Sequence, residues 1–188
     1  MCIRDSSNDY QNNIYNILSA LAVISVNSNI FNLNKNIFLN FKIPDGRGDH
    51  SIIKINNKKI NLIDQSYNSN PLSLSSAIKN FDKIKSNKSK KYLLLGDMLE
   101  LGSYSKKLHE SIAPLINQTK IDKVFVKGKM ASLIYKKISN SKKGKILSNN
   151  SQIDDLIRND IKNNDYLMIK ASLATGFNKI VNKLKGLN

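Results

Sequence analysis

The segment Tyr92-Leu-Leu-Leu95-Gly96-Asp-Met-Leu-Glu-Leu-Gly102 decides the fold class, because a short apolar run leads directly into polar residues and glycine. A run of large apolar side chains with no polar face is typical of a strand buried on both sides in a parallel sheet. Similar runs occur at Leu62-Ile63, Val124-Phe-Val126 and Leu167-Met-Ile169, and a polar loop follows each of them.

Helical periods of apolar residues separate these runs. They cover residues 73–84, 104–117, 130–138 and 151–161, with Ser151 as the expected cap of the fourth, and a last helix is expected at 177–184. Strands that alternate with helices at this spacing predict an α/β fold. We expect a Rossmann-like, mostly parallel sheet with helices on both faces.

The chain-breaking cluster Pro44-Asp-Gly-Arg-Gly48 marks the expected domain boundary. After it, residues 51–55 and 59–63 flank Asn56-Asn57 and predict a hairpin. Before it, helical spacing predicts a helix over 14–26, with Ile17, Leu21 and Ile24 on a face that is prone to self-association. We expect a leader and helical remnant in residues 1–45, where 1–6 form a non-native leader, and the main domain in 46–188.

The composition excludes several classes of protein. Cys2 is the only cysteine and there are two histidines, so a disulfide framework and a cysteine or histidine metal site are not expected. No apolar run reaches the 18 or so residues of a membrane-spanning helix, so no membrane partner is expected. The single cysteine favours a reducing, cytoplasmic setting.

The formal charge of +16 raises the question of a nucleic-acid partner. Of the 30 basic residues, 27 are lysines spread along the chain and three are arginines. Arginine is the residue that reads guanine edges with two hydrogen bonds, so the chain has few means of base recognition. No nucleic acid is expected, although a basic α/β nucleic-acid-binding domain stays an open alternative.

Ligands of open α/β sheets bind beyond the carboxyl ends of the strands. The four loops that follow the apolar runs begin at Asp64, Gly96, Lys127 and Lys170. Turn and cap formation explains any one of these loops by itself. Four polar loops at one edge favour a binding site.

Two of these loops carry long, unusual motifs. Asp64-Gln-Ser-Tyr-Asn-Ser-Asn-Pro-Leu-Ser73 and Leu95-Gly-Asp-Met-Leu-Glu-Leu-Gly102, followed by His109, resemble the C-terminal domain of the Mur ligases. Arg47 between two glycines resembles the arginine at the start of that domain. Asn13-x-x-Asn16 before an Ala/Leu-rich helix resembles the end of the family's central, ATP-binding domain. The resemblance covers about residues 12–184.

The resemblance implies the C-terminal part of an ATP-dependent amide ligase of enzyme class 6.3.2. Within the family it is nearest to members that add D-alanyl-D-alanine to a UDP-muramoyl tripeptide in peptidoglycan synthesis. In such ligases ATP phosphorylates the tripeptide carboxylate, the dipeptide amine attacks the acyl phosphate, and Mg²⁺ screens the phosphates. This chemistry needs mainly positioning and charge stabilisation from the protein.

The resemblance also assigns roles to single residues. For nucleotide binding it implies Asn13, Asn16, Arg47 and Asp64. For substrate binding it implies Tyr67, Asn68, Asn70, Asp97, Glu100, His109, Lys170 and Ser172. Gln65 stands where a second acidic residue is common in the family.

The chain contains no Gly-x-x-x-x-Gly-Lys-Ser/Thr loop, which is the cradle for nucleotide phosphates. We therefore expect a C-terminal fragment with no catalytic residue of its own, no firm binding of ATP or Mg²⁺ and no ligase activity alone. The alternative is a free-standing Rossmann-like binding module without ligase activity.

Overall fold

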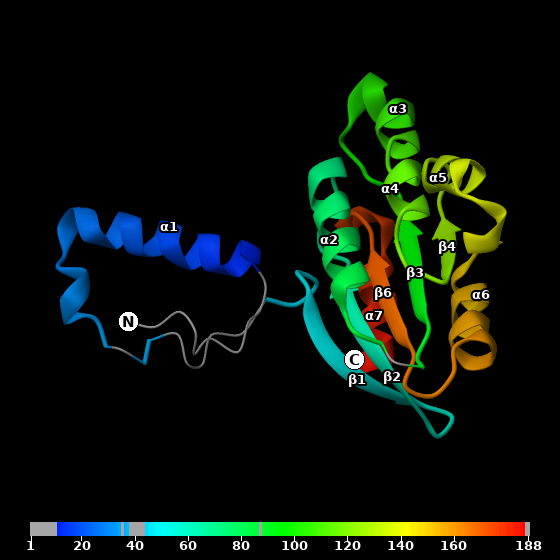
Figure 1. Ribbon diagram of the computed structural model, residues 1–188, viewed down its shortest axis with the longest axis horizontal. Helices are drawn as coiled ribbons and strands as arrows, with labels where there is room; N and C mark the ends of the chain where they lie inside the picture. Colours follow the sequence, from blue (N-terminus) through cyan, green and yellow to red (C-terminus); the bar gives the residue numbers. More distant parts are fainter. Residues whose placement is uncertain (1–10, 35, 38–43, 87, 187–188) are drawn as a thin grey trace. The chain divides into compact units, whose positions relative to one another are not determined.

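A computed structural model describes residues 11–34, 36–37, 44–86 and 88–186, without the side chains of residues 11–14 (Figure 1). The expected leader at 1–6 lies outside the described residues. The chain forms two compact units, residues 1–43 and 44–188, so the division falls two residues before the expected one. Each unit is described by itself.

The larger unit holds one six-stranded sheet with the strand order β1-β2-β6-β3-β4-β5. Only the β1–β2 pair is antiparallel, and the other pairs are parallel, which confirms the mostly parallel α/β fold. The strands are β1 (Asp49–Ile55), β2 (Lys58–Gln65), β3 (Lys91–Gly96), β4 (Lys123–Lys127), β5 (Lys143–Ile146) and β6 (Tyr166–Lys170). The helices are α1 (Gln11–Asn27), α2 (Pro71–Lys83), α3 (Ser105–Glu110), α4 (Ala113–Asn117), α5 (Ala131–Lys137), α6 (Asn150–Asp155) and α7 (Phe177–Lys185).

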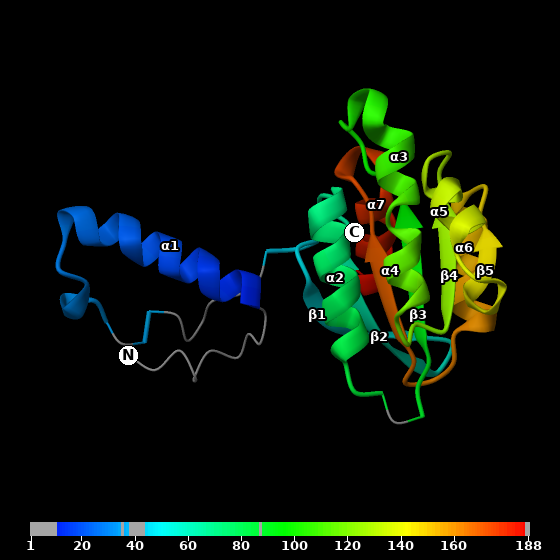
Figure 2. The same cartoon turned by 45° about the horizontal axis from the view of Figure 1, so that its top comes forward.

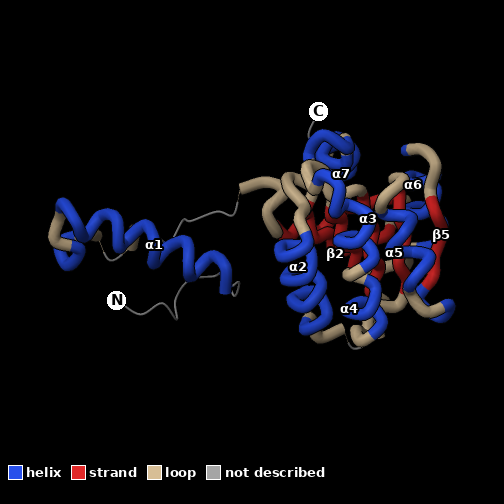
Figure 3. Tube along the Cα trace, turned by 90° about the horizontal axis from the view of Figure 1, so that it is seen from above, coloured by secondary structure: helices blue, strands red, loops and turns tan. Residues whose placement is uncertain are grey.

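Helices cover both faces of this sheet, as expected (Figure 2). Leu93 and Leu95 of β3 pack with α2, α4 and α5 in one apolar cluster. Leu94 of the same strand packs with α6 and α7 in a second cluster on the opposite face. Seen from above, the strands lie between these two helical layers (Figure 3). The alternation of side chains along β3 thus explains why its apolar run has no polar face.

Local sequence signals account for the hairpin turn and the start of α4, but not for the start of α6. Asn56 and Asn57 both adopt positive φ, 48° and 62°, as the two-residue turn of the predicted hairpin requires. The helix predicted over 104–117 is two helices, and Pro114 lies in the first turn of the second, where its missing N–H leaves no hydrogen bond unmade. The prediction that Ser151 caps α6 is wrong. Asn149 is the cap, and its side chain accepts from the Gln152 amide.

The smaller unit contains α1, which matches the helix predicted over 14–26. The predicted exposure of the face formed by Ile17, Leu21 and Ile24 is wrong, because Ile17 is buried and the other two are partly buried. The exposed apolar residues of this helix are Leu18, Val23 and Val26. Within the described part of the chain, no helix combines the length and the apolar character that crossing a membrane demands.

Candidate functional site at the carboxyl ends of the strands

The parallel strands bring their polar loops together at one edge of the sheet. Lys170 at the end of β6 pairs with Gln65 of β2 on one side and with Leu95 of β3 on the other. Gly96 of β3 pairs in turn with Lys127 of β4. We call the loops that follow, residues 66–70, 97–101, 128–130 and 171–172, the rim.

Ser172 connects three of the rim loops. Its hydroxyl accepts a hydrogen bond from the Leu99 amide (2.9 Å) and donates one to the Ser69 carbonyl (3.3 Å). Its own amide donates to the carbonyl of Asp97. The Ser172 side chain is buried, so water competes little for these bonds. The structure therefore gives Ser172 a part in positioning the loops, and its predicted contact with substrate stays a prediction.

Asp97 is held at the rim by its own neighbours. Its Oδ1 accepts a 2.7 Å hydrogen bond from the Ala131 amide at the start of α5. A Cβ at Gly128 would lie 2.2 Å from that same oxygen, so the close approach of the two loops requires glycine at position 128. Asp97 is partly buried, and Glu100 in the same loop is exposed.

His109 is fully buried behind the Asp97 loop. Its Nε2 accepts a hydrogen bond from the Met98 amide (3.0 Å), so this nitrogen carries no proton. The proton is then on Nδ1, which donates to the Ser105 carbonyl (2.7 Å). Both ring nitrogens have protein partners, and the neutral ring fixes the loop between β3 and α3. The predicted contact of His109 with substrate stays a prediction.

Lys170 is a buried cation in the centre of the rim. Its ammonium donates to the Asn68 carbonyl (2.8 Å) and lies 3.5 Å from Oε1 of Gln65. Burial lowers the pKa of Lys170 to about 8, because the charged form loses its hydration. Lys170 thus fixes the backbone of the loop that presents the exposed Asn68 side chain.

Asn70 ends this loop as the cap of α2. Its side chain accepts from the Ser73 amide (2.8 Å), and the Ser73 hydroxyl accepts from the Asn70 amide (3.1 Å), which together form a capping box. The side chain of Asn70 is therefore engaged, unlike that of the neighbouring Asn68 in the exposed part of the loop.

Arg47 stacks on Tyr67 at the start of the larger unit. Its guanidinium carbon lies 4.2 Å from the centre of the Tyr67 ring, and both side chains are exposed. Gly46 adopts φ 75°, and a Cβ there would lie 2.9 Å from the Tyr67 backbone nitrogen. The glycine thus allows the turn to lie against the loop after β2, which places a cation and an aromatic face together.

Asp64, the fourth residue predicted to bind nucleotide, is buried, and both of its oxygens accept hydrogen bonds from the protein. Its Oδ1 accepts from the amide (3.0 Å) and the hydroxyl (2.6 Å) of Ser66. Its Oδ2 lies 2.9 Å from the Lys185 ammonium. A ribose contact by Asp64 would require this 2% exposed carboxylate to become accessible, and the predicted contact stays a prediction.

Asn13 and Asn16 belong to the other unit. Both lie in α1, and Asn16 is exposed, while the side chain of Asn13 is outside the described residues. Their predicted contact with nucleotide stays a prediction.

Asp49 and Lys185 are not among the site residues predicted from the sequence. They meet Asp64 in the folded chain, although 121 positions separate Lys185 from Asp64. No local signal marks Lys185, because lysines at the end of a helix are common and most are exposed.

The described residues do not fit a magnesium site. In the described ranges, no group of three or more His, Cys, Asp or Glu side chains comes close enough to hold a metal ion. Asp49 and Asp64 share a neighbour, but it is the ammonium of Lys185, which already supplies the positive charge.

A groove of about 490 Å³ opens beside β4 at the same edge of the sheet. Its polar lining consists of Asp97, Lys127, Lys129, Ser132, Ser148 and Thr175. Lys127 lies over the Phe177 ring at 5.3 Å, which orients its ammonium. The site as a whole therefore offers fixed hydrogen-bonding groups and cations around open space, as an anionic or peptidic ligand requires.

Comparison with known proteins gives matches over most of the chain. The sequence profile of the Mur ligase glutamate ligase domain matches residues 51–173. A UDP-N-acetylmuramoyl-tripeptide–D-alanyl-D-alanine ligase of Buchnera aphidicola subsp. Acyrthosiphon pisum is 35% identical over 65% of this chain and 26% of its own length. The Bacillus subtilis ligase of the same name is 30% identical over 66% of this chain and 28% of its own length. The chain thus spans little more than a quarter of the length of these two relatives.

Solved structures give the same picture of the fold. The crystal structure of MurF ligase from Thermotoga maritima in complex with ADP aligns with a TM-score of 0.71 and 22% identity, over 93% of this chain and 38% of that one. A crystal structure of MurF from Acinetobacter baumannii aligns with a TM-score of 0.74 and 19% identity, over 94% of this chain and 38% of that one. At this level of identity the likeness concerns the fold alone.

Proposed function

The chain belongs to the Mur ligase family, and from that premise we propose that it forms the C-terminal part of an ATP-dependent ligase of peptidoglycan synthesis. The reaction joins D-alanyl-D-alanine to a UDP-muramoyl tripeptide. The curated relatives bear the name of that ligase, which supports this reaction over those of other Mur ligases. The cytoplasm, where nucleotide-linked precursors are made, is the proposed location.

The observation that carries the proposal is the fixed geometry of the rim. Ser172 holds the loops after β2 and β3 together, and Lys170 fixes the backbone of Asn68. The exposed Asn68 and Glu100 side chains therefore stand on loops that need little rearrangement when a ligand binds. Acyl transfer between two bound substrates gains most from such positioning.

Two groups of residues have separate tasks in this proposal. Arg47, which lies against the Tyr67 ring, binds the nucleotide, since a guanidinium matches phosphate oxygens with paired hydrogen bonds. Asn68, Asp97 and Glu100 orient the dipeptide. ATP, when bound in the complete enzyme, activates the tripeptide carboxylate. The described residues include no phosphate loop and no cluster of acidic or histidine side chains that could hold Mg²⁺.

The test begins with the complete reading frame of the gene and its purified product. We expect phosphate release that requires ATP, tripeptide precursor and D-alanyl-D-alanine together. Asn68→Ala should raise the KM for the dipeptide at least tenfold, because a hydrogen bond to a charged substrate contributes about 1.5–3 kcal/mol. Asn182→Ala, an exposed asparagine of α7, is the matched control and should leave the KM unchanged.

Two results would contradict the proposal. A complete product without ATP-dependent phosphate release would favour the binding module. Release by the 188-residue chain alone would show that it needs no separate phosphate loop.

A further inference from the structure

Two acidic side chains beside the Arg47 turn share a single buried ammonium. Lys185, in the last turn of α7, lies 2.5 Å from Oδ2 of Asp49 and 2.9 Å from Oδ2 of Asp64. The Lys185, Asp49 and Asp64 side chains are 9%, 17% and 2% exposed, so water screens these charges weakly. This triad is unlike the other ion pairs of the described residues, in which the lysine is mostly exposed.

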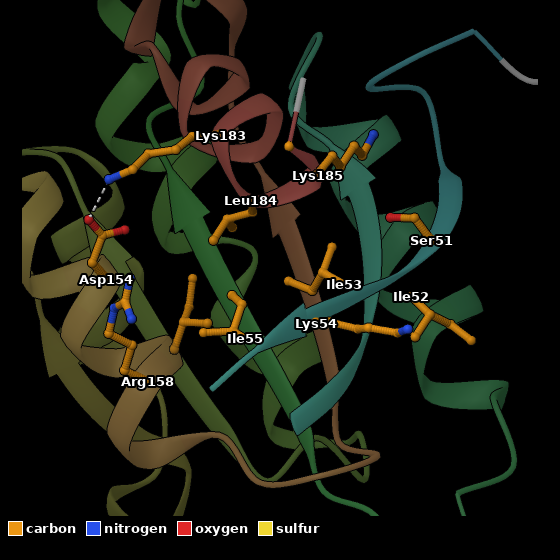
Figure 4. A pocket seen from close by; sticks show the side chains of 12 residues that line it. Ser51, Ile52, Ile53, Lys54, Ile55, Asp154, Arg158, Lys183, Leu184 and Lys185 are labelled. Carbon is orange, nitrogen blue, oxygen red and sulfur yellow. Dashed lines mark hydrogen bonds and ion pairs between the residues drawn. The ribbon is translucent and has the colours of Figure 1, made fainter. Parts of the chain in front are cut away.

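The two lysines at the end of α7 extend in opposite directions (Figure 4). Lys183 reaches Asp154 of α6 and remains 67% exposed. Lys185 extends toward the strands β1 and β2. A groove of about 450 Å³, lined in part by Ile53, Ile55 and Leu184, opens beside them. Lys183 therefore provides a matched control with the same side chain on the same helix.

Direct contacts link the triad to Arg47. Asp49 uses its second oxygen, Oδ1, to accept from the Gly46 amide (2.8 Å). The backbone carbonyl of Asp64 accepts from the Gly48 amide (2.7 Å). Arg47 lies between these two glycines, so both of its neighbours are bonded to residues that Lys185 holds.

A further bond closes the arrangement around the turn. The Gly46 carbonyl accepts from the Tyr67 amide (3.1 Å), and the Tyr67 ring carries the Arg47 guanidinium. Loss of the ammonium would leave two poorly hydrated carboxylates close together, and their repulsion would displace Asp49, the more exposed of the two. The Gly46 amide would then lose its partner.

We propose that Lys185 is a positioning residue that holds the Arg47 turn in the conformation for nucleotide binding, by joining Asp49 to Asp64. The positioning of the turn follows from the contacts themselves. The claim that the turn binds nucleotide rests on the proposed function.

Amide hydrogen exchange of the 188-residue chain, followed by NMR, tests the positioning. In Lys185→Met we expect the Gly46 amide to exchange at least tenfold faster, because its bond to the charged Asp49 contributes more than the 1.4 kcal/mol that corresponds to tenfold. The Tyr67 amide should also exchange faster, because its acceptor is the carbonyl of the displaced Gly46. The exchange rates of core amides in β3 and β6 should rise less. Lys185→Arg should restore slow exchange, and Lys183→Met should resemble the wild type.

If Lys185→Met does not fold, Asp49→Ala removes the acceptor of the Gly46 amide and leaves the pair of Lys185 with Asp64. It should accelerate exchange at the same amides. Exchange that is unchanged at Gly46 and Tyr67, or that rises no more than in the core, would overturn the inference.

Kinetics of the complete gene product separate this inference from the proposed function. Lys185→Met should raise the KM for ATP at least tenfold and leave the KM for D-alanyl-D-alanine unchanged. If Lys185→Met is an active ligase with an unchanged KM for ATP, the turn has no role in nucleotide binding. A product without ligase activity overturns the proposed function, while the exchange result still decides whether Lys185 positions the turn.

Discussion

Lys170 shows how a single buried charge makes stability depend on pH. The pKa of its ammonium is about 8 in the folded chain, below the ordinary value of 10.5, because burial removes hydration from the charged form. Below pH 8 the group is charged in both states, and its burial opposes folding. Between pH 8 and 10.5 the unfolded chain binds more protons, so the free energy of unfolding rises with pH.

We therefore expect the free energy of unfolding of the wild type, relative to that of Lys170→Met, to rise by up to about 3 kcal/mol between pH 7 and pH 10.5. Urea unfolding of both proteins at several pH values measures this difference, in which the titration of all other groups cancels. Lys129→Met changes an exposed lysine of the same edge and should follow the wild-type pH dependence. A difference between wild type and Lys170→Met that does not vary with pH would refute the explanation.

Gly128 shows how one missing side chain brings two loops together. Gly128→Ala should lower the free energy of unfolding by about 2–4 kcal/mol, because its Cβ would meet Oδ1 of Asp97 and its φ of 136° is unfavourable for alanine. Gly102→Ala is the control, since φ is also positive there but no atom lies within 4 Å. Chemical denaturation should show a loss of only about 1 kcal/mol for it. Equal losses would mean that the contact with Asp97 contributes nothing.

At the scale of elements, two asparagines near the start of α2 have different roles. Asn70→Ala removes the cap of α2 and should lower the free energy of unfolding by about 1 kcal/mol. Asn68→Ala changes an exposed side chain whose backbone carbonyl still accepts from Lys170, so stability should stay within about 0.5 kcal/mol of the wild type. Thermal and urea unfolding of the two variants would give the comparison. A larger loss for Asn68→Ala than for Asn70→Ala would reverse the assignment.

The helix α6 shows the limit of local signals. Ser151, Asn149 and Asn150 are all suitable caps by residue type, so the choice among them was ambiguous in the sequence. The helix begins at Asn150 with Asn149 as its cap, so that Ile153 is directed into the apolar cluster with α7. Packing thus determines which of these residues caps the helix, since all three are suitable by residue type.

At the scale of the whole molecule, the two apolar clusters consist of residues from the larger unit. A chain truncated to residues 44–188 should therefore keep its free energy of unfolding within about 1 kcal/mol of the full chain. Urea unfolding followed by circular dichroism measures both. A truncated chain that fails to unfold cooperatively would show that residues 1–43 contribute to the core.

The same truncation tests the expected self-association. Ile17, Leu21 and Ile24, on which the expectation was based, are buried or partly buried, but Leu18, Val23 and Val26 of the same helix are exposed apolar residues. We expect the mean mass of the full chain to rise with concentration in sedimentation equilibrium, and that of residues 44–188 to stay monomeric. A full chain that remains monomeric at high concentration would contradict the expectation.

The sequence alone was sufficient for the strands β1 to β4 and β6, for the hairpin turn at Asn56-Asn57 and for the edge of the sheet at which a site would form. These features depend on neighbours in the chain: apolar runs, turn residues and the loop that follows each strand. The motifs around Asn68 and Asp97 likewise indicated the family from the sequence alone, because each is a continuous segment.

Only the tertiary structure decided which polar groups are exposed at the rim and which hold its loops together. His109 turns both ring nitrogens inward, Ser172 joins three loops, and Lys185 meets Asp49 and Asp64 from the far end of the chain. The physical reason is that hydrogen bonds and ion pairs form between groups that folding brings together, and sequence separation does not restrict them. The sequence determines which groups are present, and their partners are determined by the packing of strands and helices.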